Sequence, residues 1–283
     1  MTTRTWFITG ASRGIGLELA RAALAAGQRV AATARRGETV AQALGDHEAL
    51  LPLDLDVTDR AQIAAAVEAA RERFGGIDVL VNNAGYGHLG LFEETTDADA
   101  RAQFDTNVFG LFEVTRAVLP LMRAQRRGHV INVSSIGGIS GAASGSLYCA
   151  SKFAVEGFSV SLADEVRDFG IHVTIVGPGF IRTDFLDPRS VRFAEPAIAD
   201  YAELSERLRS FYQQRNHQQA GDPARLAQAI LQLAEAPSPP QRFSAGSDSL
   251  DMVDARLAQL KEELDAWRAL SRSVDGEWED AAG

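Results

Sequence analysis

Thr9-Gly10-Ala11-Ser12-Arg13-Gly14-Ile15-Gly16 follows a short apolar run and opens a helical pattern that continues to Ala26. Glycines let the backbone approach a ligand closely, and the start of a helix presents unpaired N–H groups at the positive end of its dipole. A pyrophosphate suits such a turn. A glycine cluster can also be an ordinary turn, but its position between a strand and a helix favours the phosphate site.

Short β-branched runs alternate with longer amphipathic stretches, a rhythm typical of repeated βαβ units around a parallel sheet. We predict a doubly wound, Rossmann-like α/β fold of about seven strands in a single domain over residues 1–247. The expected strands are 5–9, 29–33, 49–53, 79–81, 130–134, 172–176 and, near the end, 242–245. The expected helices include 16–26, 60–73, 98–123 and 147–169.

The rhythm breaks from residue 184 to residue 221, before a helix that begins at Asp222-Pro223. This insertion borders the expected carboxyl edge of the sheet, where ligands bind in such folds. It either closes over the site as a lid or packs on the body as a surface excursion. Its aromatic residues are Phe185, Phe193, Tyr201, Phe211 and Tyr212.

An acidic helical extension is expected over residues 248–283, which carry ten acids and four bases. The spacing of its large apolar residues places them on one stripe, and we expect the stripe to pack on the body or on a sister subunit. The last stretch, 275–283, is expected to be frayed. The stripe consists of Leu250, Val253, Leu257, Leu260, Leu264 and Trp267.

Composition excludes several classes of function. The 283 residues are 46% apolar but contain no uninterrupted apolar run of membrane-spanning length, and the N-terminus lacks the pattern of a signal peptide. The net charge of -10 disfavours nucleic acids and anionic membranes as partners. The five scattered histidines indicate no metal site, and the single cysteine, Cys149, fits a cytoplasmic protein.

The end of the second predicted strand reads Thr33-Ala34-Arg35-Arg36. An acidic residue there would hydrogen-bond the ribose hydroxyls of NAD(H) and repel a 2'-phosphate. Two arginines instead favour the phosphate of NADP(H), and Arg13 in the glycine loop can reach the same group. A solvated basic turn is the alternative interpretation.

Tyr148 and Lys152 are four residues apart in a predicted helix and therefore share one face. A nearby ammonium and an oxidised nicotinamide both favour the phenolate form, so Tyr148 is a candidate general acid or base. Taken alone, the spacing is a common coincidence. Ser134 and Ser135, at the end of the fifth predicted strand, add hydroxyls at the same edge of the sheet.

In these motifs the chain resembles the short-chain dehydrogenase/reductase family, in its single-domain branch, over about residues 5–245. Besides the glycine loop, Tyr148 and Lys152, the agreement extends in order along the chain. The further matching residues are Asp56, Val57, Asn82, Asn83, Ala84, Gly85, Asn107, Pro178, Gly179, Ile181 and Thr183.

The resemblance implies a role for each matching position. Asp56 and Val57 would contact the adenine, while Asn83, Ala84 and Gly85 would line the adenosine ribose and stabilise the sheet. Lys152 would bind the nicotinamide ribose and lower the tyrosine pKa, Asn107 would position a water for proton relay, and Ser135, thirteen residues before Tyr148, would be the catalytic serine. The cofactor-contacting set is Gly10, Ser12, Arg13, Gly14, Ile15, Gly16 and Arg35, with Tyr148 and Lys152, and with Pro178, Gly179, Ile181 and Thr183 around the nicotinamide.

The implied activity is NADP(H)-dependent hydride transfer to or from a carbonyl or secondary alcohol. A non-catalytic NADP(H)-binding regulator and an epimerase or dehydratase are alternatives. The insertion aromatics, with Tyr86, Leu89, Ile139 and Leu147, suggest an apolar substrate. Members of the family are often homodimers or homotetramers.

Overall fold

The computed structural model describes residues 3–187, 190–195 and 197–276. The predicted frayed tail therefore lies outside the described residues from residue 277 onward, as do three positions of the predicted insertion. Within the described ranges, no helix is long and apolar enough to cross a membrane.

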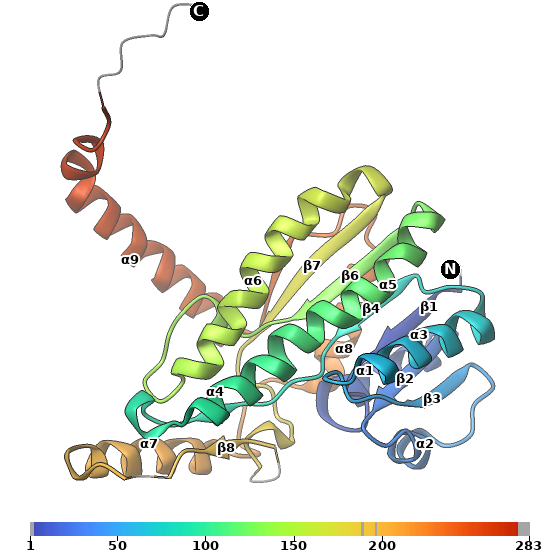
Figure 1. Cartoon of the computed structure of the whole chain (residues 1–283), viewed down its shortest axis with the longest axis horizontal. Helices are drawn as coiled ribbons and strands as arrows, with labels where there is room; N and C mark the ends of the chain where they lie inside the picture. Colours follow the sequence, from blue (N-terminus) through green and yellow to red (C-terminus); the bar gives the residue numbers. More distant parts are fainter. Residues whose placement is uncertain (1–2, 188–189, 196, 277–283) are drawn as a thin grey trace, which may run out of the picture.

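A seven-stranded, fully parallel sheet forms the centre of the molecule (Figure 1). Its spatial order, β3-β2-β1-β4-β6-β7-β9, reverses direction beside β1 and confirms the doubly wound prediction. Register is tight: Phe7 lies beside Ala31 on one side and Leu80 on the other. The strands are β1 Thr5–Ile8, β2 Arg29–Ala34, β3 Leu50–Asp54, β4 Val79–Asn82, β6 Gly128–Val133, β7 Ile171–Pro178 and β9 Arg242–Ala245.

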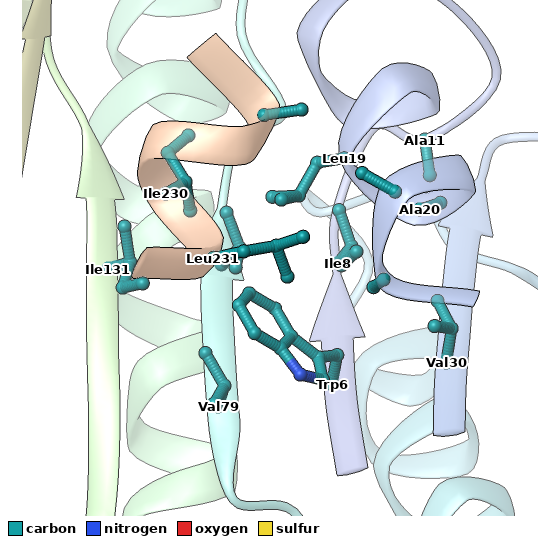
Figure 2. Packing of buried hydrophobic residues seen from close by; sticks show 14 of the residues in the cluster. Trp6, Ile8, Ala11, Leu19, Ala20, Val30, Val79, Ile131, Ile230 and Leu231 are labelled. Atoms are coloured by element: carbon teal, nitrogen blue, oxygen red, sulfur yellow. The ribbon is translucent and has the colours of Figure 1, made fainter. Parts of the chain in front are cut away.

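Helices cover both faces of the sheet, which explains why the central strands are apolar on both sides. On one face, α1 and α8 pack together over Trp6, Ile8 and Ile131 (Figure 2). On the other, α3, α5 and α6 enclose a second core around Phe7 and Leu80. The helices are α1 Gly14–Ala25, α2 Glu38–Leu44, α3 Arg60–Phe74, α4 Asp97–Phe104, α5 Leu111–Gln125, α6 Ser146–Val166, α7 Ala202–Arg215, α8 Pro223–Glu235 and α9 Ser247–Arg272.

The single helix predicted over residues 98–123 is wrong in one respect. A π-helical segment, Asp105–Gly110, separates α4 from α5. Gly110 lies so close to Val57 that a side chain there would come within 2.7 Å of the valine methyl group. The wider turn carries Asn107 into the interior, where the residue is 2% exposed. Apolar periodicity does not distinguish α-helical from π-helical turns, and π turns often occur at functional sites.

The insertion packs on the body across the carboxyl edge of the sheet. Its strand β8, Arg192–Phe193, pairs in parallel with β5, His88–Leu89, in a separate two-stranded sheet. The Ser205 hydroxyl of α7 donates a hydrogen bond of 2.7 Å to the Glu94 carboxylate. The space left between insertion and body is a cavity of about 20 Å³, lined by Leu89 and Tyr212 among others. The insertion thus packs on the body in this structure, and its closure over a bound substrate as a lid stays a prediction.

Helix α9 leaves the body (Figure 1). The predicted packing of its apolar stripe on the body is not found among the described residues, since Leu257 and Trp267 are 58% and 63% exposed. The helix forms as predicted, but no described part of this chain covers its apolar stripe.

The buried side chain of His129 on β6 should make folding pH-dependent. Burial lowers the pKa of His129 from 6.5 to about 3, and its Nε2 lies 2.9 Å from the Thr174 hydroxyl. The unfolded chain protonates this residue as pH falls below 6.5, whereas the folded chain does not until about pH 3. The stability that neutral His129 provides is thus present above pH 6.5 and lost toward pH 3.

Compared with His129→Gln, wild type should lose roughly 1.4 kcal/mol more free energy of unfolding for each pH unit below the ordinary pKa of histidine. Urea unfolding at several pH values measures this difference. His47→Gln, on an exposed loop, is the matched control and should retain the wild-type slope. Parallel slopes for wild type and His129→Gln would contradict the assignment.

Candidate active site

The glycine loop turns from β1 into α1 at the carboxyl edge of the sheet. Gly10 has φ of +68°, which favours glycine, and its neighbour across the turn is Ala84. At Gly16, a side chain would come within 2.5 Å of the Asn83 amide nitrogen. No side chain caps the N-terminus of α1, which begins after Arg13. Among the described residues, its first-turn N–H groups are therefore available to an anion, and pyrophosphate binding there stays a prediction.

Asn83 and Thr9 hold this loop in place. The Asn83 side-chain amide donates hydrogen bonds to the carbonyl oxygens of Thr9 (2.9 Å) and Gly10 (3.0 Å). The Thr9 hydroxyl accepts hydrogen bonds from the backbone N–H groups of Asn83 and Ala84, both at 3.0 Å. The end of β4 thereby fixes the turn after β1. Contact of Asn83 and Ala84 with an adenosine ribose stays a prediction.

Three arginines surround the expected adenosine end of the loop. Arg35 and Arg36 follow β2, while Arg13 precedes α1, and all three side chains are exposed. The Ala11 N–H donates to the Thr33 carbonyl oxygen at 2.8 Å, which joins the two loops. Within the described ranges, none of these guanidinium groups has a carboxylate within 4 Å. Their charge is thus available for a phosphate.

The loop after β7 lies across the glycine loop. A side chain at Gly14 would meet Thr183 at 3.4 Å, so the two loops are in direct contact. Ile181 forms a bridge with Gly221 and packs on the core beside α1 and α8. Pro178 ends β7, and the Gly179 N–H donates to the Ala245 carbonyl oxygen at 3.0 Å. The sequence-predicted nicotinamide loop is therefore adjacent to the predicted pyrophosphate site.

Tyr148 stands at the start of α6 and faces the end of β6. A hydrogen bond with the Ser135 hydroxyl lowers the pKa of Tyr148, but burial outweighs it and raises that pKa to about 12. Ser135 Oγ also accepts from the Gly137 N–H at 3.0 Å. Ser134 turns elsewhere, since its Oγ lies against Gly138. The geometry agrees with the choice of Ser135 over Ser134.

Lys152 is buried, with 7% of its surface exposed. Its ammonium donates a 2.8 Å hydrogen bond to the Val133 carbonyl oxygen and lies 5.8 Å from the centre of the Tyr148 ring. Burial lowers the pKa of Lys152 to about 8, and the negative charge of Glu156 partly opposes this shift. Lys152 was expected to lower the pKa of Tyr148, but burial has the larger effect and raises it. The protein alone therefore keeps Tyr148 protonated.

Asn107 joins this cluster through hydrogen bonds of its side-chain amide. Its amide donates to the Tyr86 carbonyl oxygen (3.0 Å) and the Ser151 hydroxyl (3.2 Å), and its oxygen accepts from the Tyr86 N–H (3.1 Å). Ser151 in turn donates to the Tyr148 carbonyl oxygen at 2.7 Å. A side chain at Gly85 would come within 3.1 Å of Asn107. Gly85 therefore packs directly against Asn107, while Val57 packs against Gly110 at the end of the π-helical segment.

The remaining predicted cofactor residues, Asp56, Ser12 and Ile15, lie near the same edge of the sheet. Asp56 follows β3 and accepts hydrogen bonds from the N–H (3.0 Å) and hydroxyl (2.7 Å) of Thr58. Ser12 is half-buried, and Ile15 packs on the core from the glycine loop. Their roles toward a cofactor stay predictions.

Aromatic residues of the insertion cover the tyrosine. The ring of Phe185 lies 5.7 Å from that of Tyr148, at an angle of 56°. The phenol of Tyr212 on α7 is close enough to raise the pKa of Tyr148. Of the predicted pocket residues, Leu147 is buried as core, and Leu89, also buried, lines the small cavity between the insertion and the body. The apolar wall next to Tyr148 comes from the insertion.

Sequence reasoning missed two residues of the site, Thr9 and Ser151. Each supports another functional group through a hydroxyl hydrogen bond that joins segments distant in the chain. A signal existed for Ser151, which is three residues after Tyr148 and therefore on its helix face. Thr9 lies both at the end of the first predicted strand and at the start of the glycine loop, and neither pattern indicates the use of its hydroxyl.

Comparison with known proteins agrees with this geometry. Residues 4–191 match the family described as short chain dehydrogenase. An oxidoreductase of Botryotinia fuckeliana, BOA17, is 39% identical over 95% of this chain and 98% of its own length. A 3-ketodihydrosphingosine reductase of Bacteroides thetaiotaomicron is 39% identical over 84% of this chain and 86% of its own.

A solved short-chain dehydrogenase from Streptomyces avermitilis superposes with a TM-score of 0.89 at 40% identity, over 97% of this chain and all of that one. On the strength of the family match and of relatives that align over nearly the whole chain, this protein belongs to the short-chain dehydrogenase/reductase family and is an oxidoreductase.

Proposed function

We propose that this oxidoreductase uses NADP(H) to interconvert a carbonyl and a secondary alcohol on an apolar substrate. The observation that carries the proposal is the joint placement of Ser135, Tyr148 and Lys152 at the carboxyl end of β6. The cluster supplies a proton donor, a hydroxyl that orients an oxygen, and a buried cation. With Asn107, all four residues that the family resemblance implies for catalysis are present, which argues against a non-catalytic regulator. The glycine spacing argues against an epimerase or dehydratase.

The residues present fit a phosphate-bearing dinucleotide. The uncapped start of α1 offers N–H donors to a pyrophosphate, and Gly10 and Gly16 keep the approach free of side chains. Arg13 and Arg35, both exposed, favour a 2'-phosphate over free ribose hydroxyls. Ile181 and Thr183 are adjacent to the loop and would hold the carboxamide.

When bound, the reduced cofactor supplies a hydride, with its two electrons, to the carbonyl carbon. Ser135 and Tyr148 donate hydrogen bonds to the carbonyl oxygen and so stabilise the negative charge that develops on it. Tyr148 then transfers its proton to that oxygen, and the raised pKa of Tyr148 ensures that the proton is present at neutral pH. Oxidation of an alcohol runs the same path in reverse.

Lys152 and Asn107 support the proton transfer without touching the carbonyl. The ammonium of Lys152 stabilises the phenolate that Tyr148 becomes when it gives up its proton. Asn107 donates hydrogen bonds to the Tyr86 carbonyl oxygen and the Ser151 hydroxyl, and it would position a water that returns a proton from solvent.

The apolar substrate class rests on the insertion. Phe185 and Tyr212 border Tyr148, so a substrate whose carbonyl reaches Tyr148 would lie next to these rings. Contact with aromatic surface favours an apolar chain or ring next to the carbonyl. The similar 3-ketodihydrosphingosine reductase is named for a substrate of that kind. NADPH oxidation with ketones, aldehydes and quinones of increasing apolar size tests the class.

We further propose a homodimer or homotetramer, since Phe109, Phe153 and Val160 are 54%, 46% and 45% exposed around α5 and α6. Large apolar side chains gathered on one surface commonly mark subunit contacts.

Tyr148→Phe removes only the phenolic oxygen, so it should abolish turnover while NADPH still binds. Loss of a positioned general acid commonly costs about 10²–10⁴-fold in rate. Steady-state rates and NADPH fluorescence titration measure the two effects separately. Phe185→Leu, which changes the neighbouring ring but no proton donor, should retain measurable turnover. Wild-type turnover in Tyr148→Phe would disprove the assignment.

Arg35→Ser should weaken NADPH binding and leave NADH binding nearly unchanged, because a charge-assisted contact to the 2'-phosphate is lost. A contribution of about 1.5–3 kcal/mol corresponds to roughly a 10- to 150-fold rise in KM for NADPH. Arg21→Ser on α1, whose partner Glu18 lies at 3.7 Å, is the matched control and should change neither constant. Equal effects on both cofactors would contradict NADP(H) preference.

The rate of carbonyl reduction should fall as pH rises through about 8, where Lys152 loses its proton. Glu156→Gln removes the charge that raises the pKa of Lys152, so it should move this alkaline limb to lower pH. Glu165→Gln, exposed on the same helix, should not move it. A limb that stays in place in folded Glu156→Gln would show that another group titrates.

A further inference from the structure

Among the described residues, the hydrogen bonds that tie helix α9 to the body come from its first turn. The Asp248 carboxylate accepts a 2.7 Å hydrogen bond from the Phe180 N–H, and the Ser249 hydroxyl donates one of 2.8 Å to the Gly177 carbonyl oxygen. Ser249 is the one buried residue that the helix contributes. The rest of its 26 residues extend away from the sheet (Figure 1).

The apolar stripe of α9 lies on this projecting part. Leu257, Leu260, Leu264 and Trp267 are between 44% and 63% exposed. They follow the alternating three- and four-residue spacing by which two helices pack along one seam. A soluble chain rarely leaves such a continuous stripe in water. The stripe therefore requires a covering surface of matching length.

We propose that the stripe is covered by α9 of a second copy of this chain, in antiparallel orientation. A two-fold axis between residues 258 and 259 pairs Leu257 with the partner's Leu260. The same register pairs Leu264 with the partner's Val253, and Leu250 with the partner's Trp267. Each apolar position of one stripe thus finds one on the other, as an isologous contact demands.

The charges that flank the stripe select this orientation. On one side of the seam, the antiparallel register brings Asp254 near the partner's Lys261. On the other side it brings Arg256 near the partner's Glu263. Both contacts are attractive, and symmetry repeats each of them. In the parallel orientation, Arg256 faces the partner's Lys261 instead, and this repulsion offsets the attraction between Glu263 and the partner's Arg268. Lys261 also lies beside Asp265 within its own helix, so the contact between copies adds to an existing pair.

A groove at the base of α9 extends the contact beyond the stripe. It encloses about 820 Å³ and is lined by Phe243, Ala245, Gly246 and Ser247 among others. In the antiparallel register, Leu270 of the partner subunit lies level with Ser247. The exposed tip of one helix is thereby brought to the groove of the other copy. Under three heptads are too short for an independent coiled coil, so this added surface explains how the pairing is stable.

Spin labels on the outer face of α9 test the orientation in the full-length chain. Ala255→Cys and Ala269→Cys place labels away from the seam, each made in a Cys149→Ala background. With a rise of about 1.5 Å per residue, antiparallel pairing separates the two 255 labels by about 10 Å along the axis and the two 269 labels by about 30 Å. A longer distance at 269 than at 255 supports the proposal. Equal distances, or no defined distance, overturn it.

Sedimentation velocity of seam variants provides a second readout. Leu257→Glu/Leu264→Glu should halve the mass of the wild-type assembly, while Ala255→Glu, on the outer face, should leave it unchanged. Asp254→Lys should weaken assembly at least about tenfold at low salt, and Asp254→Lys/Lys261→Asp should restore it. Far-UV circular dichroism confirms that each variant is folded. A mass that is the same in the seam variants as in wild type would overturn the proposal, whatever the fate of the proposed reaction.

Discussion

The hydrogen bond between the Lys152 ammonium and the Val133 carbonyl oxygen fixes the geometry on which the site depends. It crosses from α6 to the last residue of β6, and Ser135 follows only two residues later. Tyr148, one turn before Lys152 on the same helix, is thereby held against Ser135. Moving the helix along the strand by one turn, about 5.4 Å, would separate the proton donor from the hydroxyl that orients the substrate.

Burial of Tyr148 and Lys152 in this site determines the protonation of both groups. Enclosure lowers the pKa of Lys152 to about 8 and raises that of Tyr148 to about 12, so each group is pushed toward its neutral form. A neutral tyrosine suits proton donation, but a cationic lysine is needed to stabilise the phenolate that results. Glu156, one turn further along α6, partly offsets the cost of burying the ammonium. The helix therefore carries the donor, the cation and the charge that maintains the cation.

Sequence patterns were sufficient wherever function depends on backbone geometry or on short spacing. The glycine loop, the seven strands and the pairing of Tyr148 with Lys152 follow from periodicity and from the left-handed or crowded positions that only glycine tolerates. Patterns were insufficient where a contact joins distant segments. The π turn that carries Asn107 ends at Gly110, which packs against Val57 from a distant segment, and the exposure of the α9 stripe depends on what lies beside it in space. Neither neighbour is encoded in local spacing.

The two parts that lie outside the motifs are connected to the site by different means. The insertion reaches it directly, since Phe185 lies against Tyr148. Helix α9 reaches it through its first turn, because Asp248 holds the Phe180 N–H immediately before Ile181. A side chain at Gly179 would collide with that same carboxylate, so the loop and the helix start are fitted to each other. Whatever α9 binds is thus linked through one carboxylate to the loop that would hold the nicotinamide.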